Sequence, residues 1–177
     1  LDNMKFKTIN PATEEVIAEY ETASKEEILS AVKNAKSAFA KWRTFNVDER
    51  APYFRNLAEI LRENKKKYAE LMTTEMGKPI KQSLGEVEKC AWTSEVYAEN
   101  AEKWLQDELV KADGKKHLVA FEPLGTILSI MPWNFPFWQA FRFGIPALIA
   151  GNVSILKHSN VVPGCALAIE ETFMQAG

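Results

Sequence analysis

The sequence predicts an α/β protein in which N-terminal helices precede the first βαβ unit of a parallel sheet. Residues 126–131 form an apolar run rich in β-branched side chains, which is typical of a buried strand. A sharp turn over residues 132–136, an apolar helical segment and a second buried strand over Val153–Lys157 follow. Because a strand, a crossover helix and a second strand form one unit, the two strands should pair in parallel.

The segment before this unit begins with a hairpin and a helix. Residues 6–20 form two short strands around a turn at Asn10-Pro11-Ala12-Thr13. Ser24 and Glu27 have the spacing of a capping box, which predicts the start of a helix. Its apolar residues recur at three- and four-residue spacing, so we expect one buried face made of Ile28, Ala31, Val32, Ala35, Phe39 and Trp42.

Two further helical segments complete the N-terminal part. We expect Asp48 to cap a helix that bends at residues 64–67 and stops at Gly77. Pro79 suits the first turn of a long helix that reaches about Leu105. These helices should cover one face of the sheet. The expected buried positions are Tyr53, Phe54, Leu57, Ile60, Leu61, Tyr68, Leu71 and Met72.

The remaining elements flank the βαβ unit. Residues 111–116 are a polar turn, and residues 117–122 predict a strand. Pro123-Leu124-Gly125 then turns into the unit, and Pro163 opens a last helix that runs to about Gln175.

Composition excludes several classes of protein. A length of 177 residues fits one domain or two small ones, and a net charge of −2 offers no basic surface for nucleic acid. The longest apolar stretch contains Asn134 and two prolines, which excludes a membrane span. Two cysteines without ligand spacing predict neither a disulfide framework nor a metal site. Asp2, Asn3 and Lys5 do not fit a signal peptide, so we expect a cytoplasmic protein.

Polar residues that follow the two strands are the candidates for function, because ligands of parallel sheets bind at the carboxyl ends of the strands. Asn134 lies in a turn that Pro132 and Pro136 restrain. A rigidly held amide suits an oxyanion hole, where a donor stabilises the charge that develops on a carbonyl oxygen. The alternative is a turn asparagine that binds nearby backbone groups.

Two cationic side chains are further candidates. Lys157 ends the second strand, where it either extends into solvent or meets an anion or a hydroxyl group. Arg142 is four residues after Trp138 on the helix that follows the turn, so the two share a face. If that face lines a substrate site, the guanidinium could bind a carboxylate in bidentate fashion. Alternatively, Arg142 is a surface arginine paired with an acid, and Phe135 and Trp138 belong to the core.

The motifs PWNFP, AGN before the second strand and the lysine that closes it resemble the NAD(P)-dependent aldehyde dehydrogenase superfamily. INPAT near the start, MPWNFPFWQ, LKHSN and PGCALAIE extend the resemblance over nearly the whole chain, and they are most similar to the succinate-semialdehyde dehydrogenase branch. The resemblance implies a Rossmann-like sheet and an aldehyde substrate, with Asn134 at the oxyanion. It also implies an NADP or NAD site that involves Ile130, Met131, Pro132, Trp133, Lys157, Ser159 and Asn160, and substrate contacts from Arg142, Phe135 and Trp138.

Asn160 departs from the pattern of many NAD-specific members of this superfamily. A glutamate at this position would bind the ribose hydroxyl groups and repel a 2′-phosphate. The neutral Asn160 removes that repulsion, and Lys157 and His158 add donors, so we expect NADP to be accepted.

The resemblance also implies a chain more than twice as long, whose nucleophilic cysteine and general base lie beyond residue 177. We therefore expect an N-terminal piece that is inactive alone and comes from a homo-oligomer, a dimer or a tetramer. Residues 1–110 would be the hairpin and covering helices, 111–124 a strand of a β extension for subunit assembly, and 125–177 the first part of the cofactor sheet. Cys90 and Cys165 should be structural, because neither has the surroundings of a reactive thiol.

Two alternatives stay open at this point. One is an aldehyde dehydrogenase of broad specificity, which would not select a substrate carboxylate. The other is a naturally short, non-catalytic protein that binds a nucleotide or takes part in an assembly.

Overall fold

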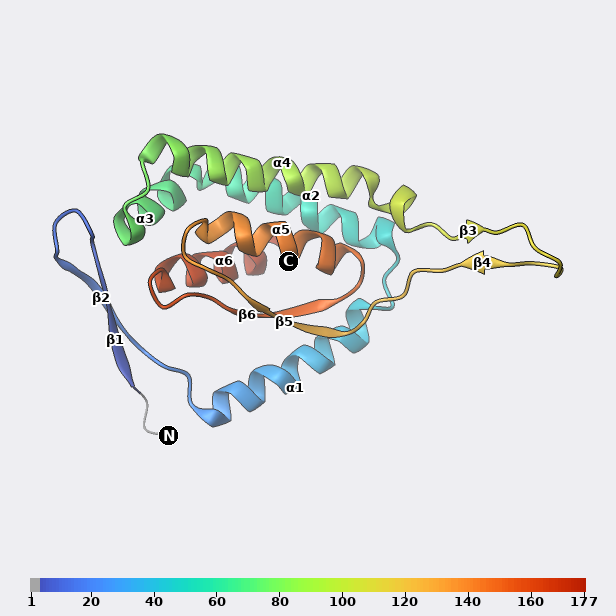
Figure 1. Ribbon diagram of the computed structural model, residues 1–177, viewed down its shortest axis with the longest axis horizontal. Coiled ribbons are helices and arrows are strands. Elements are labelled where there is room, and N and C mark those ends of the chain that lie inside the picture. Colours follow the sequence, from blue (N-terminus) through green and yellow to red (C-terminus); the bar gives the residue numbers. More distant parts are fainter. Residues whose placement is uncertain (1–3) are drawn as a thin grey trace.

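The computed structural model describes residues 4–177, so Asp2 and Asn3 lie outside the described part (Figure 1). Two short hairpins and a parallel strand pair accompany six helices within this range. The elements in chain order are β1 (Lys5–Ile9), β2 (Val16–Glu21), α1 (Lys25–Trp42), α2 (Val47–Glu63), α3 (Lys65–Met76), α4 (Ile80–Leu105), β3 (Glu108–Leu109), β4 (Leu118–Val119), β5 (Thr126–Ile130), α5 (Pro136–Ile149), β6 (Val153–Lys157) and α6 (Pro163–Ala176).

The predicted βαβ unit is confirmed. Strands β5 and β6 pair in parallel with Thr126 opposite Val153 and Ile130 opposite Lys157, and α5 is the crossover helix between them. A hydrogen bond from the Met131 N–H to the Lys157 carbonyl, with an N···O distance of 3.1 Å, extends the pairing beyond the strand ends. The predicted hairpin of β1 and β2 is confirmed as an antiparallel pair.

The helices form two layers on one side of the parallel strands and a single helix on the other. Helices α5 and α6 lie next to the strands, and α2 and α4 lie side by side over them (Figure 1). The core is formed where these helices meet. Its largest members include Tyr68, Leu57, Met72, Phe137, Phe141 and Ile145, and the rings of Phe137 and Phe141 stack on each other.

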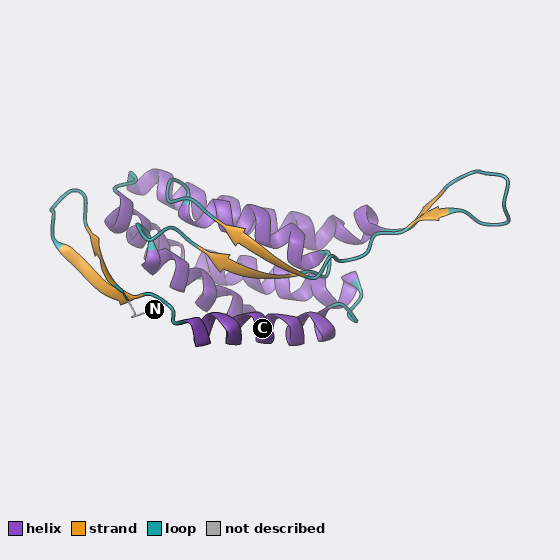
Figure 2. Ribbon diagram, turned by 60° about the horizontal axis from the view of Figure 1, so that its bottom comes forward, coloured by secondary structure: helices purple, strands orange, loops and turns teal. Residues whose placement is uncertain are grey.

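Helix α1 runs along the β6 side of the strand pair (Figure 2), and its predicted buried face is wrong. None of its residues is buried, and Ile28 and Val32 are 55% and 37% exposed. The capping box of Ser24 and Glu27 is present as predicted, so local chemistry starts the helix. The apolar face of α1 stays largely exposed because the sheet that α1 packs against has only two strands, β5 and β6.

The start of α2 also differs from the prediction. Asn46, not Asp48, is the N-cap, and it forms a reciprocal capping box with Glu49. Asp48 instead lies in the first turn, where the positive end of the helix dipole stabilises its carboxylate. Tyr53 and Ile60 are half-buried, whereas Phe54 and Leu57 are buried as expected. Helix α3 ends at Gly77 in the left-handed conformation, with φ of 75°, as predicted.

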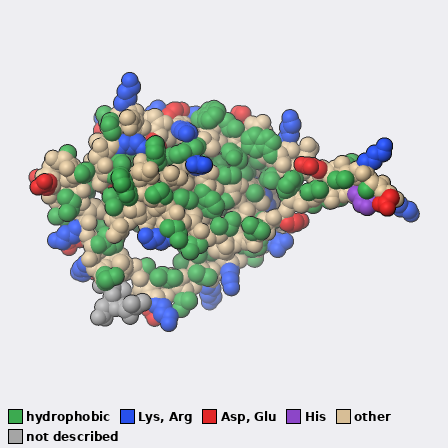
Figure 3. All heavy atoms as spheres, viewed as in Figure 1, with side chains coloured by type: hydrophobic (Ala, Val, Ile, Leu, Met, Phe, Trp, Pro, Cys, Tyr) green, Lys and Arg blue, Asp and Glu red, His purple; other side chains and the backbone are tan. Residues whose placement is uncertain are grey.

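The chain between α4 and β5 forms a hairpin that projects from the body of the molecule (Figure 1). The strand predicted over residues 117–122 is shorter than expected, because only Leu118 and Val119 pair, with β3 as their partner. The sequence pattern gave no sign of β3. Residues 111–120 are all exposed, and the space-filling view shows hydrophobic and charged side chains together on this projection (Figure 3).

Strand β5 is less buried than predicted. Leu128 and Ile130 are 61% and 68% exposed, while Ser129 between them is buried. The alternation follows from the pleat, since one face of β5 is turned toward α5, whereas α1 lies mainly against β6 and leaves the other face of β5 exposed. No helix in this range combines the length and the apolar composition needed to cross a bilayer.

Candidate functional site

The candidate site is formed by the two loops that follow β5 and β6. The hydrogen bond between Met131 and Lys157 joins the start of one loop to the end of the other strand. A second link joins His158 Nε2 to the carbonyl oxygen of Pro136 at 2.8 Å. The loops are therefore held against each other at the carboxyl ends of both strands, where parallel sheets bind ligands.

The N-terminus of α5 is capped by a distant side chain. This helix has no cap from its own flanking residues, but Glu86 Oε1 on α4 accepts hydrogen bonds from the backbone N–H groups of Phe137 and Trp138, both at 2.9 Å. A carboxylate at this position also complements the positive end of the helix dipole. Glu86 thus fixes where the helix begins, directly after the loop that carries Asn134.

Lys78 holds the same loop from the segment between α3 and α4. Its ammonium forms a buried ion pair with Glu86 and donates to the backbone carbonyl of Asn134 at 3.3 Å. It also lies 3.7 Å from the centre of the Phe135 ring, within the range of a cation–π contact. The backbone of the loop is therefore restrained by charge as well as by its prolines.

His158 is a neutral structural residue. Its Nδ1 accepts a hydrogen bond from the Ser159 N–H, so Nε2 carries the proton and donates to Pro136. Burial lowers the pKa of His158, which favours this neutral form. The expectation that His158 offers a donor to a cofactor phosphate is wrong, because both ring nitrogens are engaged and the side chain is buried.

The other predicted residues of the two loops are accessible. Asn134, Lys157 and Asn160 are exposed, Met131 and Ser159 are half-buried, and Ser159 Oγ accepts a hydrogen bond from the Val161 N–H at 3.2 Å. Pro132 is also exposed, as are Ile130 and Trp133 at 68% and 49%. Within residues 4–177, Lys157 makes no ion pair. Its ammonium is therefore available to an anion or a hydroxyl group.

The structure places Arg142 and Trp138 in different surroundings. Arg142 is exposed and lines a shallow groove with Met131 and Gln139, and no carboxylate among the described residues pairs with it. Trp138 is half-buried against the core, with the Lys89 ammonium 3.9 Å from the centre of its ring. Phe135 is 43% exposed at the start of α5. Of the three predicted substrate contacts, Arg142 is therefore the one that lines the groove together with Met131, a residue of the loop after β5.

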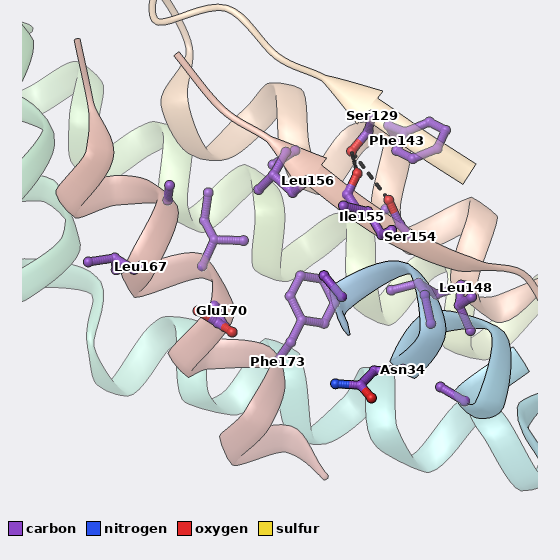
Figure 4. Close-up of a pocket in the computed structure, with 18 residues that line it drawn as sticks. Asn34, Ser129, Phe143, Leu148, Ser154, Ile155, Leu156, Leu167, Glu170 and Phe173 are labelled. Carbon is purple, nitrogen blue, oxygen red and sulfur yellow. Dashed lines mark hydrogen bonds between the residues drawn. The ribbon is translucent and has the colours of Figure 1, made fainter. Parts of the chain in front are cut away.

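A second, apolar cavity lies on another part of the molecule. It measures about 590 Å³ and is bounded by α1, β6, α5 and α6 (Figure 4). Its few polar lining groups include Ser129 and Ser154, whose hydroxyl oxygens are 3.3 Å apart. No lysine or arginine lines it, so it lacks the cations that a phosphate requires. It contains none of the predicted site residues.

The two cysteines are unsuited to nucleophilic chemistry. Both are buried, and burial is the main cause that raises the pKa of each thiol, reinforced by Glu86 near Cys90 and by Glu75 near Cys165. Glu75 is itself a helix cap, since it accepts hydrogen bonds from the backbone N–H groups of Gly164 and Cys165 at 2.8 and 2.9 Å. The described residues contain no cluster of three or more metal-ligand side chains.

Sequence reasoning missed Lys78 and Glu86. The two are eight residues apart across a helix start, which is not a recognised capping or ion-pair spacing. The one available signal was Glu86 itself, a charged residue on the buried face of an amphipathic helix. Such a residue requires a partner, but the pattern does not tell which one.

Comparison with known proteins places the chain in a family. The model described as "Aldehyde dehydrogenase family" matches residues 2–177. A probable succinate-semialdehyde dehydrogenase [NADP(+)] from Synechocystis sp. is 46% identical over 98% of the chain, and a succinate semialdehyde dehydrogenase [NAD(P)+] from Escherichia coli is 41% identical over 96%. The crystal structure of succinic semialdehyde dehydrogenase from Streptococcus pyogenes with NADP+ has a TM-score of 0.93 and 34% identity over 97% of the chain. The chain spans only 38%, 37% and 38% of these three proteins.

Proposed function

Since the chain belongs to the aldehyde dehydrogenase family, we propose that the whole protein oxidises an aldehyde, succinate semialdehyde, to its carboxylic acid with NADP or NAD through a cysteine thioester. The observation that carries the proposal is the pair of loops at the strand ends. There the exposed Asn134, on a clamped backbone, follows one strand, and the exposed Lys157 ends the strand that pairs with it. The relatives named for succinate semialdehyde support the choice of substrate.

Asn134 would act at the reacting carbonyl. As a nucleophile adds to the aldehyde, negative charge develops on the carbonyl oxygen, and a fixed amide N–H stabilises that charge without reorganising. The clamp on the Asn134 carbonyl and the Phe135 ring supports this role, because it restrains the backbone while the side chain stays exposed. The nucleophile and the general base would lie outside residues 1–177, since neither cysteine of the chain is suitable.

The loop after β6 would hold the cofactor, which supplies the hydride acceptor of the reaction. Lys157 is an exposed ammonium without an internal partner, and Ser159 Oγ accepts from Val161 and keeps its proton free to donate. Asn160 brings no negative charge to a 2′-phosphate. These groups fit the ribose and phosphate of NADP, and residues 130–133 would form the adjacent wall.

Arg142 would select the substrate. A guanidinium without an internal carboxylate partner can bind the distal carboxylate of succinate semialdehyde through two parallel hydrogen bonds. Its place in the groove beside Met131 supports this role. Phe135 and Trp138 would contribute apolar wall, Trp138 only through the part of its ring that the core leaves open.

The test compares kcat/KM for succinate semialdehyde with that for butyraldehyde, which lacks the carboxylate, in the complete protein. We expect Arg142→Ala to reduce the ratio by about 10- to 100-fold, because a charge-assisted hydrogen-bonded pair contributes about 1.5–3 kcal/mol. Arg55→Ala, another exposed helix arginine, is the matched control. An unchanged ratio would show an enzyme of broad specificity, and no turnover of either aldehyde by the parent would refute the proposed activity.

A further inference from the structure

Lys78 and Glu86 form an ion pair whose side chains are 6% and 2% exposed. Removing two charges from water costs several kcal/mol for each ion, and a good geometry with further hydrogen bonds is needed to offset that cost. A buried pair is therefore weak evidence for stability by itself. The role of this pair follows instead from the backbone groups and the ring that its two side chains contact.

The two carboxylate oxygens of Glu86 bind different partners. Oε2 binds Lys78, and Oε1 accepts the first free N–H groups of α5, those of Phe137 and Trp138. An uncapped helix start leaves such donors without partners. Glu86 therefore fixes the axial position of α5 relative to α4, which is 26 residues long and forms part of the core.

The ammonium of Lys78 is fully used as well. It donates to Glu86 and to the carbonyl oxygen of Asn134, and its remaining side faces the ring of Phe135. Together with the bond from His158 to Pro136, these contacts restrain five consecutive residues, 134–138. The side-chain amide of Asn134 has no hydrogen-bond partner among the described residues, so its direction depends on this restrained backbone.

We propose that Lys78 and Glu86 are positioning residues that aim the Asn134 amide at the reacting carbonyl, an inference that rests on the proposed function of Asn134. The pair holds the two backbone groups that flank the loop, the Asn134 carbonyl and the start of α5. Loss of either partner would let the loop relax without removing any group that touches substrate. Since a displacement of about 1 Å can cost on the order of 10²-fold in rate, the effect should fall on kcat.

A double-mutant cycle in the complete protein tests this inference. The variants are Lys78→Met, Asn134→Ala and their combination, with kcat, KM, the Kd of NADP+ and Tm measured for each. We expect Asn134→Ala and Lys78→Met each to lower kcat on the order of 10²-fold, with the Kd of NADP+ within about twofold. Because Lys78 acts through Asn134, adding Lys78→Met to Asn134→Ala should lower kcat little further.

Two further variants control for structural damage. Lys78→Met leaves Glu86 buried without a partner, so Lys78→Met/Glu86→Gln removes both charges, and the same cycle is measured on this background if the single variant does not fold. Lys65→Met breaks a half-buried pair with Glu88 that lies away from the loop of Asn134, and it should leave kcat unchanged.

The outcomes separate the two proposals. If the effects of Lys78→Met and Asn134→Ala on kcat multiply, Lys78 does not act through Asn134, and the inference is refuted while Asn134 keeps its role. The inference is equally refuted by an unchanged kcat in both the Lys78 variant and the charge-free pair. An unchanged kcat in Asn134→Ala alone would remove the proposed role of Asn134 and the positioning inference with it.

Discussion

Asn160 is the residue on which the proposed preference between NADP and NAD depends. It is exposed in the loop after β6, three residues beyond the exposed Lys157. An asparagine there is neutral, and the nearby Lys157 contributes a positive charge that favours a phosphate. With His158 turned inward, the proposed preference for NADP would rest on Lys157, Ser159 and Asn160.

Replacing Asn160 with glutamate should shift the cofactor preference from NADP toward NAD. The new carboxylate would repel a 2′-phosphate and accept hydrogen bonds from ribose hydroxyl groups, so we expect the ratio of kcat/KM for NADP over NAD to fall by about tenfold or more, or about 1.4 kcal/mol. Steady-state kinetics with each cofactor in the complete protein measure this ratio. Asn56→Glu, an equivalent change on the exposed side of α2, is the control. An unaltered ratio in Asn160→Glu would show that residue 160 does not face the 2′-position.

At the residue scale, sequence reasoning could find the accessible members of the site but not their supports. Lys157 ends a predicted strand, Asn134 and Asn160 each come three residues after one, and parallel pairing brings strand ends together. Lys78 and Glu86 reach the same loop from 56 and 51 residues earlier in the chain. That approach depends on how α4 packs on α5, which no local pattern encodes.

At the scale of elements, α5 is held at both ends by side chains from other helices. Glu86 binds its N-terminus, while Arg50 Nη1 donates to the Ile149 carbonyl at 2.9 Å and Trp42 Nε1 to the Leu148 carbonyl at 2.7 Å. A negative group at the start and a positive group at the end both complement the helix dipole. Gly151 follows directly, with φ of 95°.

Gly151→Ala should therefore destabilise the protein, and Gly85→Ala should stabilise it. A Cβ at Gly151 would lie 2.7 Å from Arg50 Nη2 and would occupy a backbone region unfavourable to L-residues, whereas a Cβ at Gly85, within α4, meets nothing within 4 Å. We expect a loss of about 1–3 kcal/mol at residue 151 and a gain of about 0.5–1 kcal/mol at residue 85. Urea unfolding measures both, and equal effects of the two substitutions would contradict the assigned role of Arg50.

The elements themselves were largely predictable, and their exposure was not. The capping box of Ser24 and Glu27, Gly77 and the apolar runs are local signals, so they placed the helices and the βαβ unit. The open face of α1 and the exposed side of β5 could not be inferred, because an amphipathic pattern states which face can be buried and not whether a partner lies beneath it. The β3 strand has two residues, too few for any periodicity.

At the scale of the whole molecule, the β3–β4 hairpin is the part with the least internal support. Leu109 and Val119 are 77% and 46% exposed on it, and it extends away from the helical body. Exposed apolar side chains on a projecting hairpin, with strand edges unpaired within residues 4–177, suit contact with another subunit. We propose that this hairpin takes part in subunit assembly.

Replacing Leu109 and Val119 together with aspartate should lower the oligomeric state of the complete protein. The substitutions remove apolar contact area and place charge in the interface, while the core, which these residues do not contact, keeps its Tm within a few degrees. Light scattering after size-exclusion chromatography measures the mass. Lys116→Glu, which changes charge at the polar end of the same hairpin, should leave the mass as it was. A variant that keeps the parental mass would exclude the hairpin from assembly.

The charged caps of α5 and α6 also have a consequence for folding during synthesis. Glu75 and Glu86 leave the ribosome well before the N–H groups that they bind, and Trp42 precedes its partner Leu148 by 106 residues. Until residues 137–165 have been made, Glu75 and one oxygen of Glu86 have no backbone N–H groups to bind, so we expect α3 and α4 to pack fully only after that. We therefore expect the helices of the nascent chain to pack loosely until α6 has been translated.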